Sequence, residues 1–273
     1  MGKAKLNKKN IGITGSDGFI GRHLLELLEK DEKFNIRCFK GDLLREKDVK
    51  DFFKEKDIDT VIHLAGAFFG DFDTLLNINF KTTENLVKIG TENGMKKIIF
   101  SSTGAVYGEP VNNASRESDP TKPNTYYGMT KLFAEKLIEL HNYLDGLEYV
   151  ILRFPNVYGE GNDKGVIFNF LRDIKEKGAI TVYGDGSAAR NFLHVSDACN
   201  ALENSLSYGK SEIFNISNPI KVSINDLISI LQKDYNFKVD HKDENNKLHD
   251  LLLDTGKAKR ELGFEPKVKG ILL

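Results

Sequence analysis

Short apolar runs alternate with amphipathic stretches along the first 155 residues of the chain. The apolar runs lack a period of two, which is typical of parallel strands that are covered on both faces. They predict strands at 10–14, 34–39, 59–66, 96–102 and 148–154. The stretches between them place apolar residues at helical spacing and predict helices at 18–30, 45–56, 77–94 and 125–144. This alternation predicts an α/β fold with a doubly wound parallel sheet and right-handed crossovers.

The pattern changes after residue 155. Glycine-rich stretches flank a helix predicted at 166–177, and a helix from 196, a strand at 212–217 and a helix at 223–234 follow. The highly charged stretch 238–250 predicts an exposed loop. We therefore predict a Rossmann-type domain over 1–160 together with 190–217, and a smaller, discontinuous substrate-binding lobe from 161–189 and 218–273.

The composition matters mainly for what it excludes. The chain has 273 residues, 40% hydrophobic and 29% charged, which is typical of a soluble globular protein. Its net charge of −1 creates no field that would attract nucleic acid or an anionic membrane, and no apolar run reaches the ~18 residues of a membrane span. Cys38 and Cys199 give no disulfide framework, so we expect two buried thiols in a cytoplasmic protein. The histidines show no ligand spacing, and no metal site is expected.

The stretch GITGSDGFIGRHL joins the first predicted strand to the first predicted helix. In a Rossmann loop the first glycine permits the tight turn, the second lets the backbone approach a pyrophosphate, and the third lets the helix pack on the strand. The helix N-terminus adds N–H donors for phosphate. A plain turn and cap is the alternative. We expect NAD or NADP to be bound by Gly15, Asp17, Gly18, Phe19, Ile20 and Gly21.

The end of the second predicted strand bears on the choice between NAD and NADP. A carboxylate usually stands there and binds the ribose 2′-hydroxyl of NAD. In RCFKGDL, Lys40 is near this place and Asp42 follows two residues later. A lysine could accept the 2′-phosphate of NADP, which favours NADP slightly. An ordinary surface lysine is the alternative.

The stretch YYGMTK opens the helix predicted at 125–144. Tyr127 and Lys131 are four residues apart and share one helix face, whereas Tyr126 and Lys131 do not. A neighbouring ammonium and an oxidised nicotinamide would lower the pKa of a phenol from about 10. Such a tyrosine can exchange a proton with an alcohol while hydride moves to the cofactor. Two aromatic residues that only pack the helix are the alternative.

The fourth predicted strand ends in the hydroxyl residues Ser101, Ser102 and Thr103. One of them could hydrogen-bond the substrate oxygen. A Tyr-x-x-x-Lys pair is common by chance, but behind a hydroxyl-rich end of the fourth parallel strand it indicates a catalytic site.

These motifs resemble the extended short-chain dehydrogenase/reductases, in particular the NAD(P)-dependent epimerase/dehydratase group that acts on nucleotide sugars. The similarity runs along nearly the whole chain and includes TGSDGFIG, VIHLAG, FSSTGAVYGE, LRFPNVYGEGN, VYGDGSAARNFLHVSDA and DTGKAKRELGFEP. Alignment on the family's Ser/Thr-x-x-Val-Tyr-Gly places the catalytic hydroxyl at Thr103. The resemblance implies that Thr103 polarises the sugar oxygen and that Tyr127 acts as acid and base. It also implies that Lys131 holds the nicotinamide ribose and lowers the tyrosine pKa.

The resemblance also implies further contacts. Cofactor contacts are implied for Asp42, Leu43, Leu64, Ala65, Gly66, Ser101, Phe154 and Pro155, the last two beside the nicotinamide. Asn156 and Arg190 would hold the nucleotide sugar, with the Arg190 guanidinium at its diphosphate. A turn residue at 156 and a surface ion pair at 190 are the alternatives.

The chain departs from the family pattern in several places. The segment between the second and third strands is short, and Thr82 stands where a glycine is common. Family members that dehydrate the sugar place Asp-Glu after the catalytic threonine, whereas Gly104 and Ala105 follow here, which disfavours a 4,6-dehydratase. The chain stops soon after GFEPKVKG, so we expect a trimmed last helix.

The preferred interpretation is a nucleotide-sugar 4-epimerase that works through a transient 4-keto intermediate. The alternative is an NADPH-dependent 4-keto-sugar reductase, which Lys40 and the short segment favour. A non-catalytic NAD(P)-sensing module is disfavoured by the Thr103, Tyr127 and Lys131 set. The resemblance further implies a homodimer through helices at about 75–93 and 126–144, with a monomer as the alternative. The sequence does not specify the sugar or the nucleotide.

Overall fold

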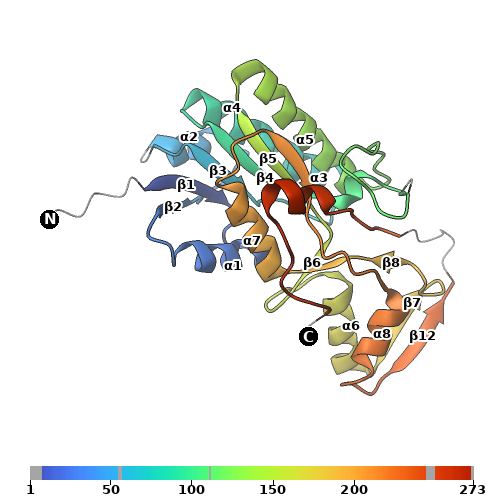
Figure 1. Cartoon of the computed structure of the whole chain (residues 1–273). Helices are drawn as coiled ribbons and strands as arrows, with labels where there is room; N and C mark the ends of the chain where they lie inside the picture. Colours follow the sequence, from blue (N-terminus) through green and yellow to red (C-terminus); the bar gives the residue numbers. More distant parts are fainter. Residues whose placement is uncertain (1–7, 55–56, 111, 244–249, 272–273) are drawn as a thin grey trace.

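The computed structural model describes residues 8–54, 57–110, 112–243 and 250–271 (Figure 1). Most of the lysine-rich tail and the centre of the predicted loop at 238–250 lie outside the described residues. The last two residues of the helix predicted at 45–56 do so as well. The chain forms a larger lobe around a parallel sheet and a smaller lobe at one end of it (Figure 1).

The central sheet confirms the predicted doubly wound topology. In the described part of the chain it has six strands, all paired in parallel, in the order β10-β5-β4-β3-β1-β2. The strands are β1 (Lys9–Thr14), β2 (Phe34–Cys38), β3 (Thr60–His63), β4 (Lys97–Thr103), β5 (Glu148–Phe154) and β10 (Glu212–Asn215). Because helices cover both faces, the centres of the inner strands are apolar, whereas the edge strand β2 alternates apolar and polar residues.

Two groups of helices cover the two faces of the sheet (Figure 1). On one face lie α1 (Phe19–Leu28) and α7 (Val195–Ser205), which share a core with β1 and β5. On the other lie α2 (Glu46–Lys54), α4 (Thr82–Glu92) and α5 (Tyr126–Asp145). The Thr125 side chain caps the start of α5, and Gly146 ends it in the left-handed conformation at φ 71°.

The helix predicted at 77–94 is longer and less regular than expected. It begins with α3 (Phe72–Leu75), continues through a π-helical segment (Leu76–Lys81) and ends as α4. Its earlier start has a local cause, because the Asp71 carboxylate accepts the Thr74 N–H at 2.8 Å and caps α3. The π-helical turns matter for the site, since they carry the buried Asn79.

The smaller lobe has its own apolar core. It contains α6 (Gly165–Lys177), β7 (Ala179–Tyr183), β8 (Ala189–Arg190), β11 (Val222–Ser223), α8 (Ile224–Leu231) and β12 (Lys238–Lys242). The prediction of an exposed loop over 238–250 is wrong for 238–242, because β12 pairs in parallel with β7. The reason is Val239, which packs on the lobe's core between charged neighbours that face outward. The predicted strand at 212–217 ends at Asn215.

The residue boundaries predicted for the two lobes stay a prediction, but the packing of the chain near the C-terminus departs from them. As expected, α7 and β10 return to the larger lobe. Ala258, Leu262 and Phe264 also belong to the larger lobe's core, although the predicted boundary assigns them to the smaller one. These apolar residues fill the space beside α7, so the last described segment joins both lobes.

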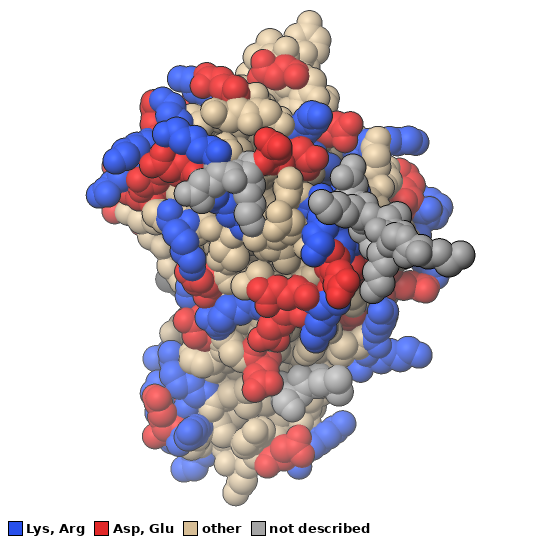
Figure 2. Space-filling view, turned by 90° about the vertical axis from the view of Figure 1, so that its left-hand side faces the viewer, with Lys and Arg blue, Asp and Glu red and all other residues tan. Residues whose placement is uncertain are grey.

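The surface agrees with the near-zero net charge. Figure 2 shows lysine, arginine and carboxylate side chains intermingled over the face in view. No helix among the described residues is long and apolar enough to cross a membrane. Cys199 is buried, which raises the pKa of its thiol to about 12, whereas the expectation of a buried Cys38 is wrong because that side chain is half-buried.

Candidate active site

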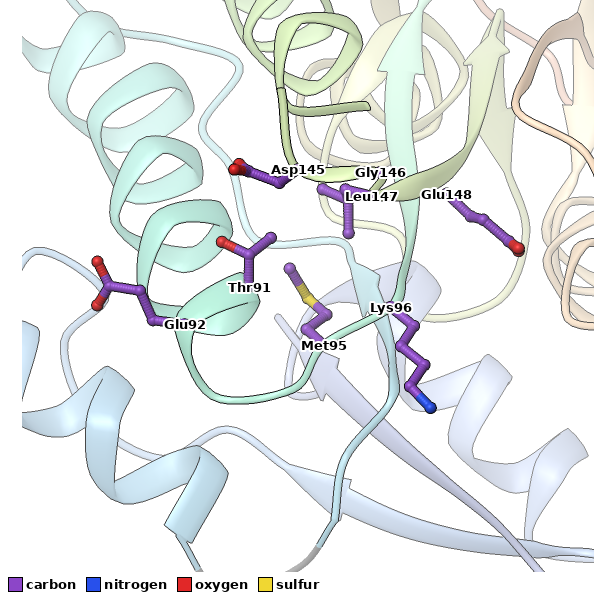
Figure 3. A pocket seen from close by; sticks show the side chains of 8 residues that line it. All are labelled: Thr91, Glu92, Met95, Lys96, Asp145, Gly146, Leu147 and Glu148. Atoms are coloured by element: carbon purple, nitrogen blue, oxygen red, sulfur yellow. The ribbon is translucent and has the colours of Figure 1, made fainter. Parts of the chain in front are cut away.

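The carboxyl ends of the parallel strands meet at one edge of the sheet, where ligands bind in open α/β folds. Thr14, His63, Thr103 and Phe154 end β1, β3, β4 and β5 there. A hollow of about 480 Å³ lies at the opposite edge, before β4 and β5, between Lys96 and the segment 145–148. Figure 3 shows the side chains that line this hollow, which come from the end of α4, the turn before β4 and the turn between α5 and β5, and none of them is a predicted site residue.

The glycine loop after β1 has the geometry expected of a phosphate cradle. Gly15 has φ 69°, and a Cβ added to it would lie 2.6 Å from the Ala65 amide nitrogen. A Cβ on Gly21 would lie 2.2 Å from the Gly15 carbonyl oxygen. Larger residues are therefore excluded at both positions. Gly18 caps α1, so the helix N-terminus opens toward the loop, and the residues fit a dinucleotide pyrophosphate.

Lys40 is paired within the loop region rather than isolated. Its ammonium lies 3.1 Å from Oδ1 and 3.2 Å from Oδ2 of Asp17, and both side chains are exposed. Asp42 follows Lys40 by two residues and accepts the Leu44 N–H at 2.9 Å. The pair with Asp17, a residue of the glycine loop, places Lys40 beside the cradle.

Leu43 differs from its neighbours in this region. Its side chain is buried in the core of the larger lobe against α2 and α4. The expected adenine contact can therefore come only from its backbone. Leu64 and Ala65 are half-buried at the end of β3, directly beside Gly15.

The structure brings Tyr127 next to Thr103, the hydroxyl residue that the family resemblance selects. Their side chains are hydrogen-bonded, and the Thr103 oxygen also accepts the Ala105 N–H at 3.1 Å. Burial raises the pKa of Tyr127 to about 12, while the hydrogen bond to Thr103 acts in the opposite direction. The expected fall of this pKa requires a bound nicotinamide as well as Lys131, so it stays a prediction.

Lys131 lies on the same face of α5 and is buried. Its ammonium donates to the Ser101 carbonyl at 2.9 Å and lies 4.7 Å from the centre of the Phe100 ring. Burial lowers its pKa to about 8, and the Glu135 carboxylate opposes this shift. A Cβ added to Gly66 would lie 3.1 Å from the same ammonium. The structure therefore brings Ser101, Gly66 and Lys131 together, as expected of cofactor-binding residues.

A buried polar network behind the site was not predicted. Glu135, one helical turn after Lys131, forms an ion pair with Arg153 at 2.6 Å, and both side chains are almost fully buried. The Ser102 hydroxyl donates to Glu135, and Arg153 donates to the Tyr107 hydroxyl at 2.8 Å. The only signal in the sequence is the position of Glu135, four residues after Lys131 on the same helix face. The network fixes α5 to the ends of β4 and β5.

A second unpredicted feature is the amide of Asn79 in the π-helical segment. Its Oδ1 accepts the Ala67 N–H at 2.8 Å, and its Nδ2 donates to the Ala67 carbonyl at 3.0 Å. Nδ2 also donates to the Thr130 hydroxyl at 3.1 Å, one turn from Tyr127. Asn79 thus fastens the loop after β3 to the catalytic helix. An asparagine in the apolar pattern NINF is the only sequence signal for it.

The four remaining predicted residues lie where the two lobes join. Phe154 is buried at the end of β5, and Pro155 and the half-buried Asn156 follow it. Asn156 opens β6 (Asn156–Tyr158), which pairs with β9 (Phe192–His194), so it lies opposite Phe192. Arg190 is two residues before Phe192, half-buried, and donates to the Ala189 carbonyl at 2.8 Å. The structure therefore places Asn156 and Arg190 on adjacent segments.

A Rossmann-type sheet whose glycine cradle lies next to a Thr–Tyr–Lys set defines an NAD(P)-dependent enzyme of the extended short-chain dehydrogenase/reductase class. The NAD-dependent epimerase/dehydratase family model matches residues 11–217, and the chain belongs to this family.

Known relatives share most of the chain. The UDP-glucose 4-epimerase of Halalkalibacterium halodurans is 30% identical over 93% of this chain and 90% of its own. The dTDP-4-dehydro-6-deoxyglucose reductase of Escherichia coli is 31% identical over 96% and 94%. The crystal structure of a UDP-glucuronic acid 4-epimerase from Bacillus cereus, in complex with NAD, superposes with a TM-score of 0.85 at 26% identity, covering 95% of this chain and 94% of that one. The family thus includes proteins named for neutral and for acidic hexoses.

Proposed function

We propose that the protein is a nucleotide-sugar 4-epimerase. The observation that carries the proposal is the hydrogen-bonded pair of Thr103 and Tyr127, with Lys131 on the same helix face and the phosphate cradle beside it. Membership of the family and the similarity to the two 4-epimerases named above support the same reaction. The segment Gly104–Ala105 after Thr103 offers no carboxylate pair for water elimination, which argues against a dehydratase.

The chain's own residues would act as follows. Thr103 would hydrogen-bond the 4-oxygen of the hexose, and Tyr127 would take the hydroxyl proton and later return it. Lys131 would bind the nicotinamide ribose through an ammonium now held by the Ser101 carbonyl at 2.9 Å. NAD(P), held by the glycine loop and Lys131, would supply the reversible hydride acceptance that epimerisation at C4 requires. Asn156 and Arg190 would hold the nucleotide and its diphosphate.

The second candidate is a 4-keto-sugar reductase that consumes NADPH with the same three residues. Lys40 favours it, and so does the similarity to the dTDP-4-dehydro-6-deoxyglucose reductase. The experiment that separates the two incubates purified protein with UDP-, GDP- and dTDP-hexoses and their 4-keto forms, with and without NADPH. Epimerised product without NADPH consumption supports the proposal. NADPH consumption with only the 4-keto sugar would select the reductase.

Lys40 is the group that would distinguish NADP from NAD, and a slight preference for NADP stays a proposal. We expect Lys40→Asp to weaken NADP binding relative to NAD by about 10-fold or more, because one charge-assisted hydrogen bond to the 2′-phosphate is worth ~1.5–3 kcal/mol. Titration of both cofactors against the wild type and the variant measures the ratio. Lys33→Asp, on an exposed lysine away from the loop, is the control. An unchanged ratio would remove Lys40 from cofactor selection.

We also propose a homodimer formed through α5 and the neighbouring helix, which consists of α3, the π-helical segment and α4. Leu140, Tyr143 and Leu144 are exposed on α5, and the Phe133 ring packs on Phe80 of the preceding helix at 6.2 Å. Such an apolar helix face is typical of a two-fold interface.

We expect the double variant Leu140→Lys/Leu144→Lys to halve the mass measured by light scattering. Buried lysines at the centre of an apolar interface would be left without partners. Tyr235→Lys, on the smaller lobe, should leave the mass unchanged. A wild-type protein of monomer mass would refute the dimer.

A cytoplasmic location, supported by the free thiols of Cys38 and Cys199, is proposed as well and can be tested by cell fractionation.

A further inference from the structure

The loop after β3 presents two phenylalanines beside the catalytic tyrosine. The ring of Phe68 contacts the ring of Tyr127 edge to face, with centroids 4.7 Å apart, and Phe69 packs on Phe68 at 4.6 Å. Nevertheless 49% of Phe68 and 66% of Phe69 remain exposed. Two large apolar side chains at the phenol therefore show an open face, which a ligand of Tyr127 would cover.

This loop is fixed at both ends. Asn79 holds Ala67 through two hydrogen bonds, as described above. At the other end the Asp71 side chain caps α3, and Gly70, at φ 152°, makes the turn between them. Two phenylalanines held this way form a preformed wall, because the loop loses little entropy when a ligand binds.

The charges around Tyr127 select the kind of sugar that fits this wall. Segments 66–72, 101–108 and 123–130 each contribute a residue at or next to the Tyr127–Thr103 pair. The three segments contain no lysine, arginine or histidine. Their only charged residue is Asp71, which lies in segment 66–72. The ammonium of Lys131, on the same helix face as Tyr127, points to the Ser101 carbonyl. A carboxylate on the reacting sugar would lose water here without gaining a counter-ion.

We propose that Phe68 and Phe69 form a subsite for the hexosyl group and restrict the reaction to sugars that are uncharged beside the reacting carbon: neutral hexoses, deoxyhexoses or N-acyl hexosamines, and not uronic acids. The inference rests on the proposed function, since it assumes that a nucleotide sugar meets Tyr127. It concerns the sugar alone, whereas Asn156 and Arg190 are assigned to the nucleotide.

The test measures binding, so that it does not depend on turnover. UDP-glucose and UDP-glucuronate share nucleotide and ring and differ in charge at C6, and both are titrated into the NAD-loaded Tyr127→Phe protein. We expect the Kd of UDP-glucuronate to exceed that of UDP-glucose by about 10-fold or more, as an unpaired charge at an apolar surface requires. Phe68→Lys should bring the ratio to within about 2-fold, whereas Phe68→Leu, which keeps the wall apolar, should preserve it.

Tyr235→Lys is the control variant. It adds the same charge on the smaller lobe and should leave the ratio of the two Kd values unchanged, which separates a local effect from an effect of net charge. Equal or tighter binding of UDP-glucuronate to the starting protein would overturn this inference and leave the epimerase proposal standing. A ratio that Phe68→Lys does not move would overturn the role of Phe68. Binding of no UDP-, GDP- or dTDP-hexose, with NAD bound, would overturn the proposed function and this inference with it.

Discussion

We expect Tyr127→Phe to lower kcat for the proposed epimerisation by about 10³-fold, within the ~10²–10⁴-fold range of positioned acid–base groups. The variant keeps the ring that packs on Phe68 and loses only the hydroxyl that is bonded to Thr103. Without that hydroxyl, no described side chain next to Thr103 can take the proton of the sugar alcohol at the same place. Steady-state kinetics with the nucleotide sugar that the turnover assay selects measures the factor, and thermal unfolding tests whether the fold is retained.

Tyr126→Phe is the matched control for this result. Tyr126 is 59% exposed and packs its ring on Phe72, on the other side of the helix start. We expect its kcat to stay within about 2-fold of the wild type, since a surface change of this kind costs little. Near-normal activity of Tyr127→Phe, or a large loss in Tyr126→Phe, would contradict the assignment of Tyr127 as the acid and base.

The second large effect is expected on stability, at the buried pair of Glu135 and Arg153. Arg153→Met should lower the free energy of unfolding by about 3–5 kcal/mol, because it leaves the Glu135 carboxylate buried without its partner. The pair lies at 2.6 Å with exposed fractions of 2% for Arg153 and 0% for Glu135, so little water can replace the lost contact. Urea unfolding at fixed protein and cofactor concentrations measures the change.

Two further variants test the cause. The double variant Glu135→Leu/Arg153→Met should recover much of the loss, because it removes both charges together. Arg172→Met breaks an exposed pair with Asp173 at 3.1 Å and should cost less than about 1 kcal/mol. If Arg153→Met costs no more than Arg172→Met, the buried network does not hold α5 to the sheet.

Much of the fold could be predicted because its signals are local. Each strand of the central sheet from β1 to β5 is a short apolar run between turn residues, and each helix has its own periodicity. Predictions failed where distant contacts decide the local structure. Val239 makes β12 a strand only because a core and the edge of β7 lie beside it, and this pairing joins residues about sixty positions apart.

The site divides in the same way. The spacing of Gly15 to Gly21 and of Tyr127 to Lys131 fixes geometry within one turn or one helix, and therefore identifies candidate chemistry before any fold is known. The expected fall in the pKa of Tyr127 is a different matter. It depends on how burial and nearby charge balance once a nicotinamide is bound. In the protein without the cofactor, burial raises the pKa of Tyr127 to about 12.

By itself, the sequence determined the doubly wound sheet, the phosphate loop and the choice of Tyr127 over Tyr126. These follow from short-range periodicity and spacing. Only the tertiary structure decided which groups surround the phenol: the wall of Phe68 and Phe69 held by Asn79, and the Glu135–Arg153 pair behind Lys131. The physical reason is that burial and pairing are properties of neighbours brought together by the sheet, and no local pattern encodes which distant side chain will desolvate or neutralise a given group.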